Sequence, residues 1–194
     1  MMSKGQITQL LKQVNAGDRQ VLNDVYALMY TEIKSIAGFQ LRQLNTGQTI
    51  TPTVLAHECY IKLSQAENIP LENKRHFLNC LAKTMRLYLI DALRAKSSQK
   101  RKGQIAAGIT EYMGDEDVSY KLLDIDLALE QIEAIDEKLA EILQHKLIFN
   151  LTFKEMAAVM GLSERQIMRL WKQAKALLLS MLKESNKSEG SEHV

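Results

Sequence analysis

Four basic side chains recur at helical spacing near the end of this sequence. Arg165 and Arg169 lie four residues apart, and Lys172 and Lys175 follow at intervals of three. On a helix, this spacing gathers cations on one surface. A guanidinium group can pair with phosphate or with two acceptor atoms of guanine, whereas a lysine ammonium group suits the phosphate backbone. The chemistry on offer is therefore the binding of a polyanion, with nucleic acid as the first candidate.

Local start signals predict two helices around this basic run. Thr152 with Glu155, and Ser163 with Gln166, have the spacing of a capping box. In a capping box each side chain bonds to the backbone N–H of the other residue, so that a helix can begin there. We therefore expect a short helix near residues 153–160 and a longer one from residue 164.

A sharp turn is predicted between these two helices. Gly161 lies between them, and glycine can take the positive φ that a tight corner requires. The small Ala157 permits close approach of two crossing helices, and Ile167 is expected to close the corner. This spacing predicts a helix-turn-helix. The remaining inward positions are Met156, Met160, Leu162 and Leu170, with Trp171 half-buried.

The outward side of the second helix is the candidate DNA-reading surface. In a helix-turn-helix, the second helix enters the major groove with its N-terminal residues at the base edges. An ordinary helical hairpin with a solvated basic face is the alternative. The two caps, the Ala-Gly-Ile spacing and the charge agree, and together they favour DNA binding. The predicted contact residues are Ser163, Glu164, Arg165, Met168, Arg169, Lys172 and Lys175.

Metal chemistry is a competing possibility in the first half of the chain. Cys59, Cys80, His57 and His76 have metal-binding side chains, but none shows a spacing such as Cys-x-x-Cys. His57 and Cys59 are two residues apart on a predicted helix, so they point to different faces, and we expect Cys80 in the core. The sequence also has no P-loop, dinucleotide fingerprint or nucleophile elbow. We therefore predict no metal, no cofactor and no catalytic activity.

The composition predicts an all-α protein. The chain has 194 residues, of which 46% are hydrophobic and 25% charged, with only 2 Pro and 9 Gly. Its abundant Leu, Ala, Lys, Glu and Gln favour helix. No apolar run is long enough to span a membrane, and the N-terminus shows no signal-type apolar segment. Two cysteines do not make a disulfide framework, so the expected location is the cytoplasm.

The charges are segregated along the chain. Residues 74–102 hold nine basic residues and one acidic, residues 104–141 hold two basic and eleven acidic, and residues 142–183 hold seven basic and two acidic. This pattern suggests two anion-binding modules joined by an acidic connector. The connector either covers the basic helix of one module or serves as a solvated tether, and both alternatives stay open here.

Hydrophobic periodicity places helices over 6–45, with a turn inside, over about 53–64 with Thr53 as a candidate cap, over about 76–96, and again from about 127. Two small helical domains joined by an acidic linker are therefore expected. The predicted boundaries are 1–102 for the first domain, 103–126 for the linker, 127–184 for the helix-turn-helix domain and 185–194 for a flexible tail.

Two stretches of the first half resemble region two of a bacterial sigma factor of the extracytoplasmic-function (ECF) type, in the sigma-70 family. The stretches are TPTVLAHECYIKLS, from Thr51, and HFLNCLAKTMRLYLIDALRAK, from His76. Usual forms in that family are Asp-Leu-Val-Gln-Glu-x-Phe-Leu-x-Leu, represented here by the run from Val54 to Leu63, and a long helix ending Ile-Asp-x-Leu-Arg, here Ile90 to Arg94. The C-terminal half is similar to region four, and together the resemblance covers about residues 7–182.

The resemblance implies a sigma factor that binds core RNA polymerase and directs promoter recognition and transcription initiation. Region two would bind the polymerase clamp and melt the minus-ten element, and region four would read the minus-thirty-five element. The usual clamp-binding Asp is Val54 here, and the usual Gln is His57. The implied polymerase-binding residues are His57, Glu58 and Lys62. The implied minus-ten residues are Asn73, Lys74, Arg75, His76, Lys83, Arg86 and Tyr88.

Core RNA polymerase and promoter DNA are the implied partners, and an anti-sigma factor is a further candidate. A helix-turn-helix regulator whose first half binds an effector is the alternative. That regulator would bind specific DNA without polymerase, whereas a sigma factor needs core polymerase.

Overall fold

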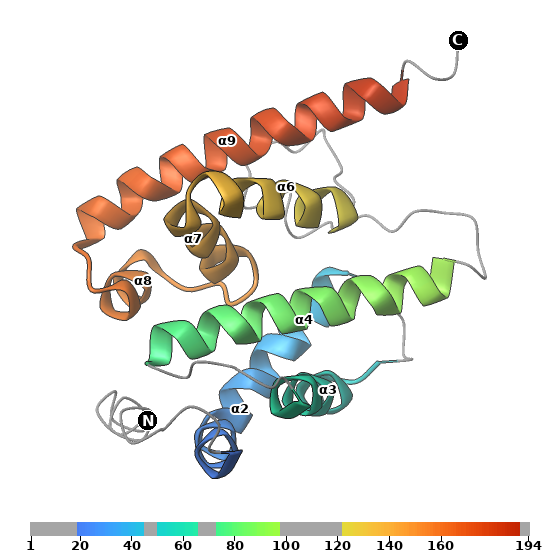
Figure 1. Ribbon diagram of the computed structural model, residues 1–194, viewed down its shortest axis with the longest axis vertical. Helices are drawn as coiled ribbons and strands as arrows, with labels where there is room; N and C mark the ends of the chain where they lie inside the picture. The colour runs from blue at the N-terminus through green and yellow to red at the C-terminus, as the bar shows by residue number, and fades with distance from the viewer. Residues whose placement is uncertain (1–18, 45–49, 66–72, 98–121, 191–194) are drawn as a thin grey trace. The chain divides into compact units, whose positions relative to one another are not determined.

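The computed structural model describes residues 19–44, 50–65, 73–97 and 122–190 (Figure 1). Within these ranges there are seven helices and no strand, which confirms the all-α prediction. The helix expected over residues 6–18, with its turn, and the greater part of the predicted acidic linker lie outside the described residues. In the part of the chain that is described, no helix combines the length and apolarity needed to cross a membrane.

The chain divides into two compact units, Met1–Leu89 and Ile90–Val194, and the division falls within one helix, α4. The first unit contains α2 (Arg19–Gln43), α3 (Pro52–Gln65) and the larger part of α4 (Lys74–Ser97). Its core is an apolar stripe from each helix, as the helical periodicity predicts. The most buried members are Val25, Met29 and Ile33 on α2, Leu55 and Cys59 on α3, and Phe77, Leu81 and Met85 on α4.

Aromatic side chains join the three helices of this unit. The buried Tyr26 of α2 donates its hydroxyl hydrogen to the carbonyl oxygen of Ala56 on α3. Its ring meets the edge of Tyr60, with centroids 5.2 Å apart, and of Phe77 on α4, at 6.5 Å. The Tyr60 hydroxyl on α3 donates a hydrogen bond to Asn23 Oδ1 on α2 at 2.6 Å. These contacts fix α3 and α4 against α2 through buried area and hydrogen bonds together.

Capping residues set the beginnings of α3 and α4. The expected cap, Thr53, lies inside α3, which begins at Pro52. Thr51 is the cap, because its Oγ1 accepts the Val54 backbone N–H at 3.2 Å. Proline suits the first helical position, where no intrahelical partner exists for the missing N–H. At α4, Asn73 Oδ1 accepts the His76 N–H at 3.0 Å and starts the helix at Lys74.

The second unit contains α6 (Leu122–Ile135), α7 (Glu137–Leu147), α8 (Phe153–Met160) and α9 (Glu164–Gly190). Helices α6, α7 and α8 each pack against α9. Helix α6 begins at Leu122, before the expected start near Leu127, because Leu122, Ile125 and Leu129 form one buried stripe. Helix α9 continues to Gly190, beyond residue 184, where the helix-turn-helix domain was expected to end.

The turns of this unit are formed by polar residues. Asp136 separates α6 from α7, and its Oδ1 accepts the N–H groups of Lys138 at 2.9 Å and Leu139 at 3.4 Å. Between α7 and α8, Asn150 adopts a positive φ of 51°, a conformation that asparagine tolerates better than most residues. These turns deliver α8 to the N-terminal end of α9, where the candidate site lies.

Candidate nucleic-acid interface

Both predicted capping boxes are present in the helix-turn-helix. At α8, Thr152 Oγ1 accepts the Glu155 N–H at 3.2 Å, and Glu155 Oε2 accepts the Thr152 N–H at 2.8 Å. At α9, Ser163 Oγ accepts the Gln166 N–H at 3.3 Å, and Gln166 Oε1 accepts the Ser163 N–H at 2.9 Å. Each box satisfies two backbone donors that would otherwise lack a partner at a helix start.

Gly161 makes the corner, as predicted. It has φ 68° and ψ 30°, and its N–H bonds to the carbonyl oxygen of Ala157. No atom lies within 4 Å of a Cβ built at this position. Glycine is therefore required by the left-handed backbone and not by lack of space.

The inward side of the corner is a small hydrophobic core. Its buried members are Ile142, Met156, Ala157, Met160 and Ile167, and Leu162, Leu170 and Trp171 pack against them partly buried. The inward assignments made from the sequence are confirmed, including the half-buried Trp171. Ile142 comes from α7, so two other helices, α7 and α8, pack against the first turns of α9.

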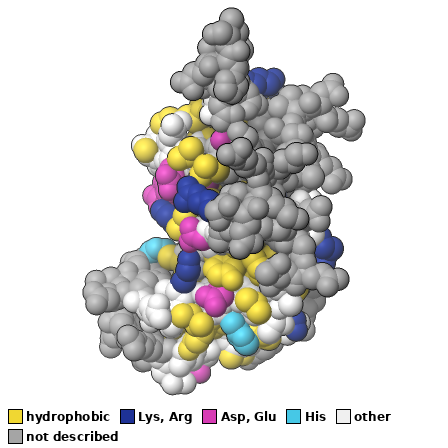
Figure 2. Space-filling model, turned by 90° about the vertical axis from the view of Figure 1, so that its right-hand side faces the viewer, with side chains coloured by type: hydrophobic (Ala, Val, Ile, Leu, Met, Phe, Trp, Pro, Cys, Tyr) yellow, Lys and Arg dark blue, Asp and Glu magenta, His cyan; other side chains and the backbone are white. Residues whose placement is uncertain are grey.

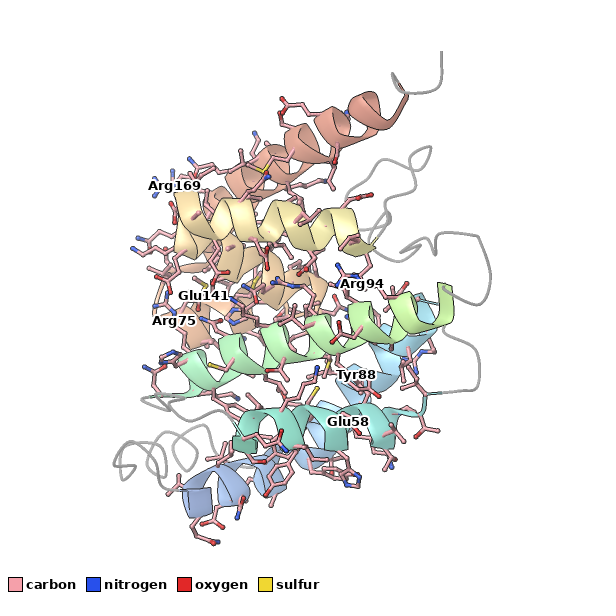
Figure 3. The ribbon with its side chains drawn as sticks, turned by 45° about the vertical axis from the view of Figure 1, so that its right-hand side comes forward. Glu58, Arg75, Tyr88, Arg94, Glu141 and Arg169 are labelled. Carbon is pink, nitrogen blue, oxygen red and sulfur yellow. The ribbon has the colours of Figure 1, made fainter. Side chains whose placement is uncertain are left out.

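The outward side of α9 carries the predicted contact residues. Ser163, Glu164, Arg165, Met168, Arg169 and Lys172 are exposed, and Lys175 is half-buried. Arg165, Met168, Arg169 and Lys172 recur at the three- and four-residue spacing of a single helix stripe. Figure 3 shows Arg169 projecting from α9. Ser163 is occupied in the capping box, whereas Glu164, Arg165, Met168 and Arg169 are exposed near the N-terminal end of α9.

Lys146 of α7 stabilises the turn that leads into α8, although it was not among the residues predicted from the sequence. Its Nζ donates to the carbonyl oxygen of Leu151 at 3.0 Å and lies 5.5 Å from the ring centroid of Phe153. The ammonium group thereby fixes the α7–α8 turn through a hydrogen bond and a cation–π contact. A lysine seven residues before an aromatic residue carries no recognisable sequence signal.

The face of α3 predicted to bind polymerase is a continuous exposed stripe. His57 and Lys62 are exposed, and Glu58 is half-buried between them. Val54 and Ile61 complete the stripe, each 41% exposed, and the prediction had not included them as contact residues. In the lower part of Figure 2, where α2, α3 and α4 lie, hydrophobic side chains are visible at the surface beside acidic and histidine side chains. This face therefore combines charge with apolar area.

The residues implied to contact the minus-ten element are distributed along α4. Four of them lie at its N-terminal end: the exposed Asn73 and the half-buried Lys74, Arg75 and His76. Lys83 is exposed about two turns further along the helix. Tyr88 lies beyond them, about 18 Å from His76 along the helix axis. Its ring centroid is 5.6 Å from Lys62 Nζ, so Tyr88 lies beside the α3 face (Figure 3). Burial and the nearby Glu58 carboxylate raise the pKa of Tyr88.

Arg86 differs from the rest of that set. It is 1% exposed, so its guanidinium group does not face solvent. A residue that contacts DNA must present its donors at the surface, and Arg86 is therefore not part of the DNA-binding surface proposed below.

The cysteines are positioned for packing. Burial raises the pKa of the Cys59 thiol to about 12, and it also raises the pKa of the half-buried Cys80. A thiol that stays protonated is a poor nucleophile and a poor metal ligand. His57 is exposed whereas Cys59 is buried, which confirms that they point to different faces.

The fold and the α8–α9 corner define the class of this molecule as a helical protein with a helix-turn-helix. The sequence matches the model of the ECF sigma factor family over residues 4–184. The chain therefore belongs to the ECF sigma factor family, as the resemblance indicated. No curated protein and no solved structure matches it. Membership makes the chain a regulatory factor of transcription initiation, with core RNA polymerase and promoter DNA as its class of partners.

Proposed function

We propose that the chain binds core polymerase through α3 and contacts promoter DNA through two separate surfaces. The observation that carries the proposal is the α8–α9 corner, where local caps and a left-handed glycine hold one stripe of exposed cations on α9. A buried inner side and a charged outer side are what a major-groove reader requires. The proposed DNA-reading module comprises residues 127–184 together with the first turn of α6, and its target is the upstream, minus-thirty-five element.

The first module, residues 1–102, is proposed to bind polymerase and the minus-ten element. His57, Glu58 and Lys62 form the charged part of the polymerase surface, and Val54 and Ile61 add exposed apolar area to the same stripe. A mixed surface of this kind suits a protein partner better than a nucleic acid. On α4, the N-terminal residues Asn73, Lys74, Arg75 and His76, together with Lys83, are the proposed contacts to unpaired promoter DNA. Tyr88 stays a candidate for base stacking.

Reconstitution tests this function directly. The purified chain is mixed with core polymerase, and complex formation, promoter binding and transcript formation are measured on the same DNA. The expected result is a stable complex that binds promoter DNA and initiates, whereas the chain alone binds the same DNA only weakly. Specific, tight duplex binding by the chain alone, with no affinity for core polymerase, would favour the helix-turn-helix regulator instead.

A further inference from the structure

Met168 is the apolar member of the exposed stripe on α9 that is proposed to read DNA. It is 53% exposed, and among the described residues it is the only exposed large hydrophobic side chain on α8 or α9. The core of the corner is complete without it, because Ile167 and its neighbours already fill the inner side. A single exposed apolar side chain is common on protein surfaces and is not by itself a site. What distinguishes Met168 is its position within the stripe of exposed cations on α9.

The surroundings of Met168 indicate what the ligand would be. Arg165 lies one turn before it, Arg169 is the next residue, and Lys172 lies one turn after it, all exposed. Three cations around one apolar side chain match a duplex groove, in which anionic phosphates surround the base edges. A hydrophobic protein partner would not be expected to bury these cations without acidic residues of its own.

The major groove offers one apolar group, the 5-methyl of thymine. Ser163 and Gln166 are occupied by each other in the capping box, so the polar side chains beside Met168 are the charged Glu164, Arg165 and Arg169. A thioether side chain is flexible and adapts to an irregular apolar contact. The exposed Met168 is therefore suited to a methyl group and unsuited to the hydrogen-bonding edges beside it.

We propose that Met168 is a specificity-determining residue that selects a thymine in the upstream element by contact with its 5-methyl group. The proposal rests on the proposed function of α9 as the upstream reader. Arg165 and Met168 are separated by about 4.5 Å along the helix axis, comparable with the base-pair rise of about 3.4 Å. The thymine is accordingly expected within about two base pairs of a guanine read by Arg165.

The test uses the chain bound to core polymerase and an upstream duplex selected by this complex from a random pool. Each thymine of the selected duplex is replaced in turn by deoxyuridine, which keeps the base pairing and removes only the methyl group. At one position the wild-type complex should lose roughly three- to fourfold in affinity, the value expected for one buried methyl group. Met168→Ala should show no loss there, and Met168→Leu should retain it.

Gln173→Ala is the matched control, because Gln173 is exposed on another side of α9 and should leave the uracil effect intact. The proposal is overturned if no deoxyuridine replacement lowers the affinity of the wild-type complex. It is also overturned if the Met168→Ala complex still loses affinity at the same position. In both cases the proposed role of α9 in binding the upstream element is unaffected. A Met168→Ala chain that loses affinity for core polymerase and keeps its uracil effect overturns the proposal in favour of a protein contact. A complex that selects no upstream duplex overturns both this proposal and the proposed function.

Discussion

Individual side chains on α9 are expected to divide between reading sequence and binding phosphate. Arg165 stands in the first turn, near the base edges, whereas Lys172 stands two turns further along the exposed stripe. Arg165→Ala should weaken binding to the selected upstream element by about 1–3 kcal/mol and relax base preference at one position. Lys172→Ala should weaken all duplexes alike and lower the salt slope by about one unit.

Equilibrium titrations of the polymerase complex on matched and scrambled upstream duplexes, at several salt concentrations, measure both effects. Lys34→Ala, which removes an exposed lysine of α2, is the control and should change neither. Identical behaviour of the Arg165 and Lys172 variants on both duplexes would show that α9 is not the reader.

Glu58 is the residue through which the α3 surface can be tested. Glu58→Lys replaces the only acidic side chain of the stripe by a third basic one, beside His57 and Lys62. The affinity for core polymerase should fall, because a group on the partner that pairs with the carboxylate would then meet a like charge. The fold should persist, since a partly exposed charge contributes little to a core. Competition against another sigma factor measures the affinity. Glu32→Lys, the same reversal on the exposed face of α2, serves as control, and an equal affinity in both variants would remove α3 from the interface.

At the scale of elements, the position of α3 depends on the buried Tyr26 hydroxyl. Tyr26→Phe removes the bond to the Ala56 carbonyl but keeps the ring contacts with Tyr60 and Phe77. We expect the free energy of unfolding to fall by about 1 kcal/mol. The loss is modest because the Ala56 carbonyl oxygen lies within α3 and can still accept its helical hydrogen bond. Denaturant unfolding of the full chain measures the change. Tyr60→Phe, at a half-buried position, should cost less, and the reverse order would contradict this account.

Elements with local signals could be predicted from the sequence. The α8–α9 corner follows from residues within a few positions of one another: two capping boxes, Gly161, and the apolar residues that flank it. The start of α3 was misplaced because Thr51 and Thr53 are both plausible caps, and the decisive signal was Pro52 at the first helical position. The early start of α6 was missed because polar residues interrupt its apolar stripe.

Contacts between elements could not be predicted in the same way. The sequence marks Tyr26, Tyr60 and Phe77 as aromatic, but only packing brings these rings together. Packing also buries Arg86, which the family resemblance had implied as a contact to the minus-ten element. The resemblance placed Tyr88 and His76 in one set of minus-ten residues, whereas the length of α4 separates them and Tyr88 lies beside Lys62. The exposed residues of α9 were easier to predict, because helical spacing assigns them to one face.

At the scale of the whole molecule, the segregation of charge has a testable consequence. Part of the acidic connector, from Leu122 onward, belongs to α6, where Asp126 is buried and Asp124 half-buried. Asp124 and Asp126 are therefore poor candidates for masking a basic module, and the acids to test are those before α6: Asp115, Glu116 and Asp117, which lie outside the described residues. If these acids cover a basic module, replacing Asp115, Glu116 and Asp117 by Asn, Gln and Asn should raise the DNA affinity of the free chain at low salt.

The gain should shrink towards physiological salt, where charges separated by more than about 8–10 Å are largely screened. DNA titrations of the free chain over a salt series measure it. Replacing Glu130, Glu133 and Glu137, which lie within the helices of the second unit, by Gln gives a control of equal charge change. Equal gains in both triple variants would reflect net charge alone and would favour the solvated tether.

The two capping boxes of the α8–α9 corner also affect the order in which parts of this protein fold. Each cap closes between residues three positions apart, and the turn itself closes when the Leu162 N–H reaches the Ala157 carbonyl oxygen, at 3.1 Å. Closing such short loops costs little chain entropy, and structures dominated by local contacts form quickly. The first unit instead joins Asn23 to Tyr60 and Tyr26 to Phe77 across long stretches of chain. We therefore expect the α8–α9 corner to form before the aromatic contacts that join α2, α3 and α4.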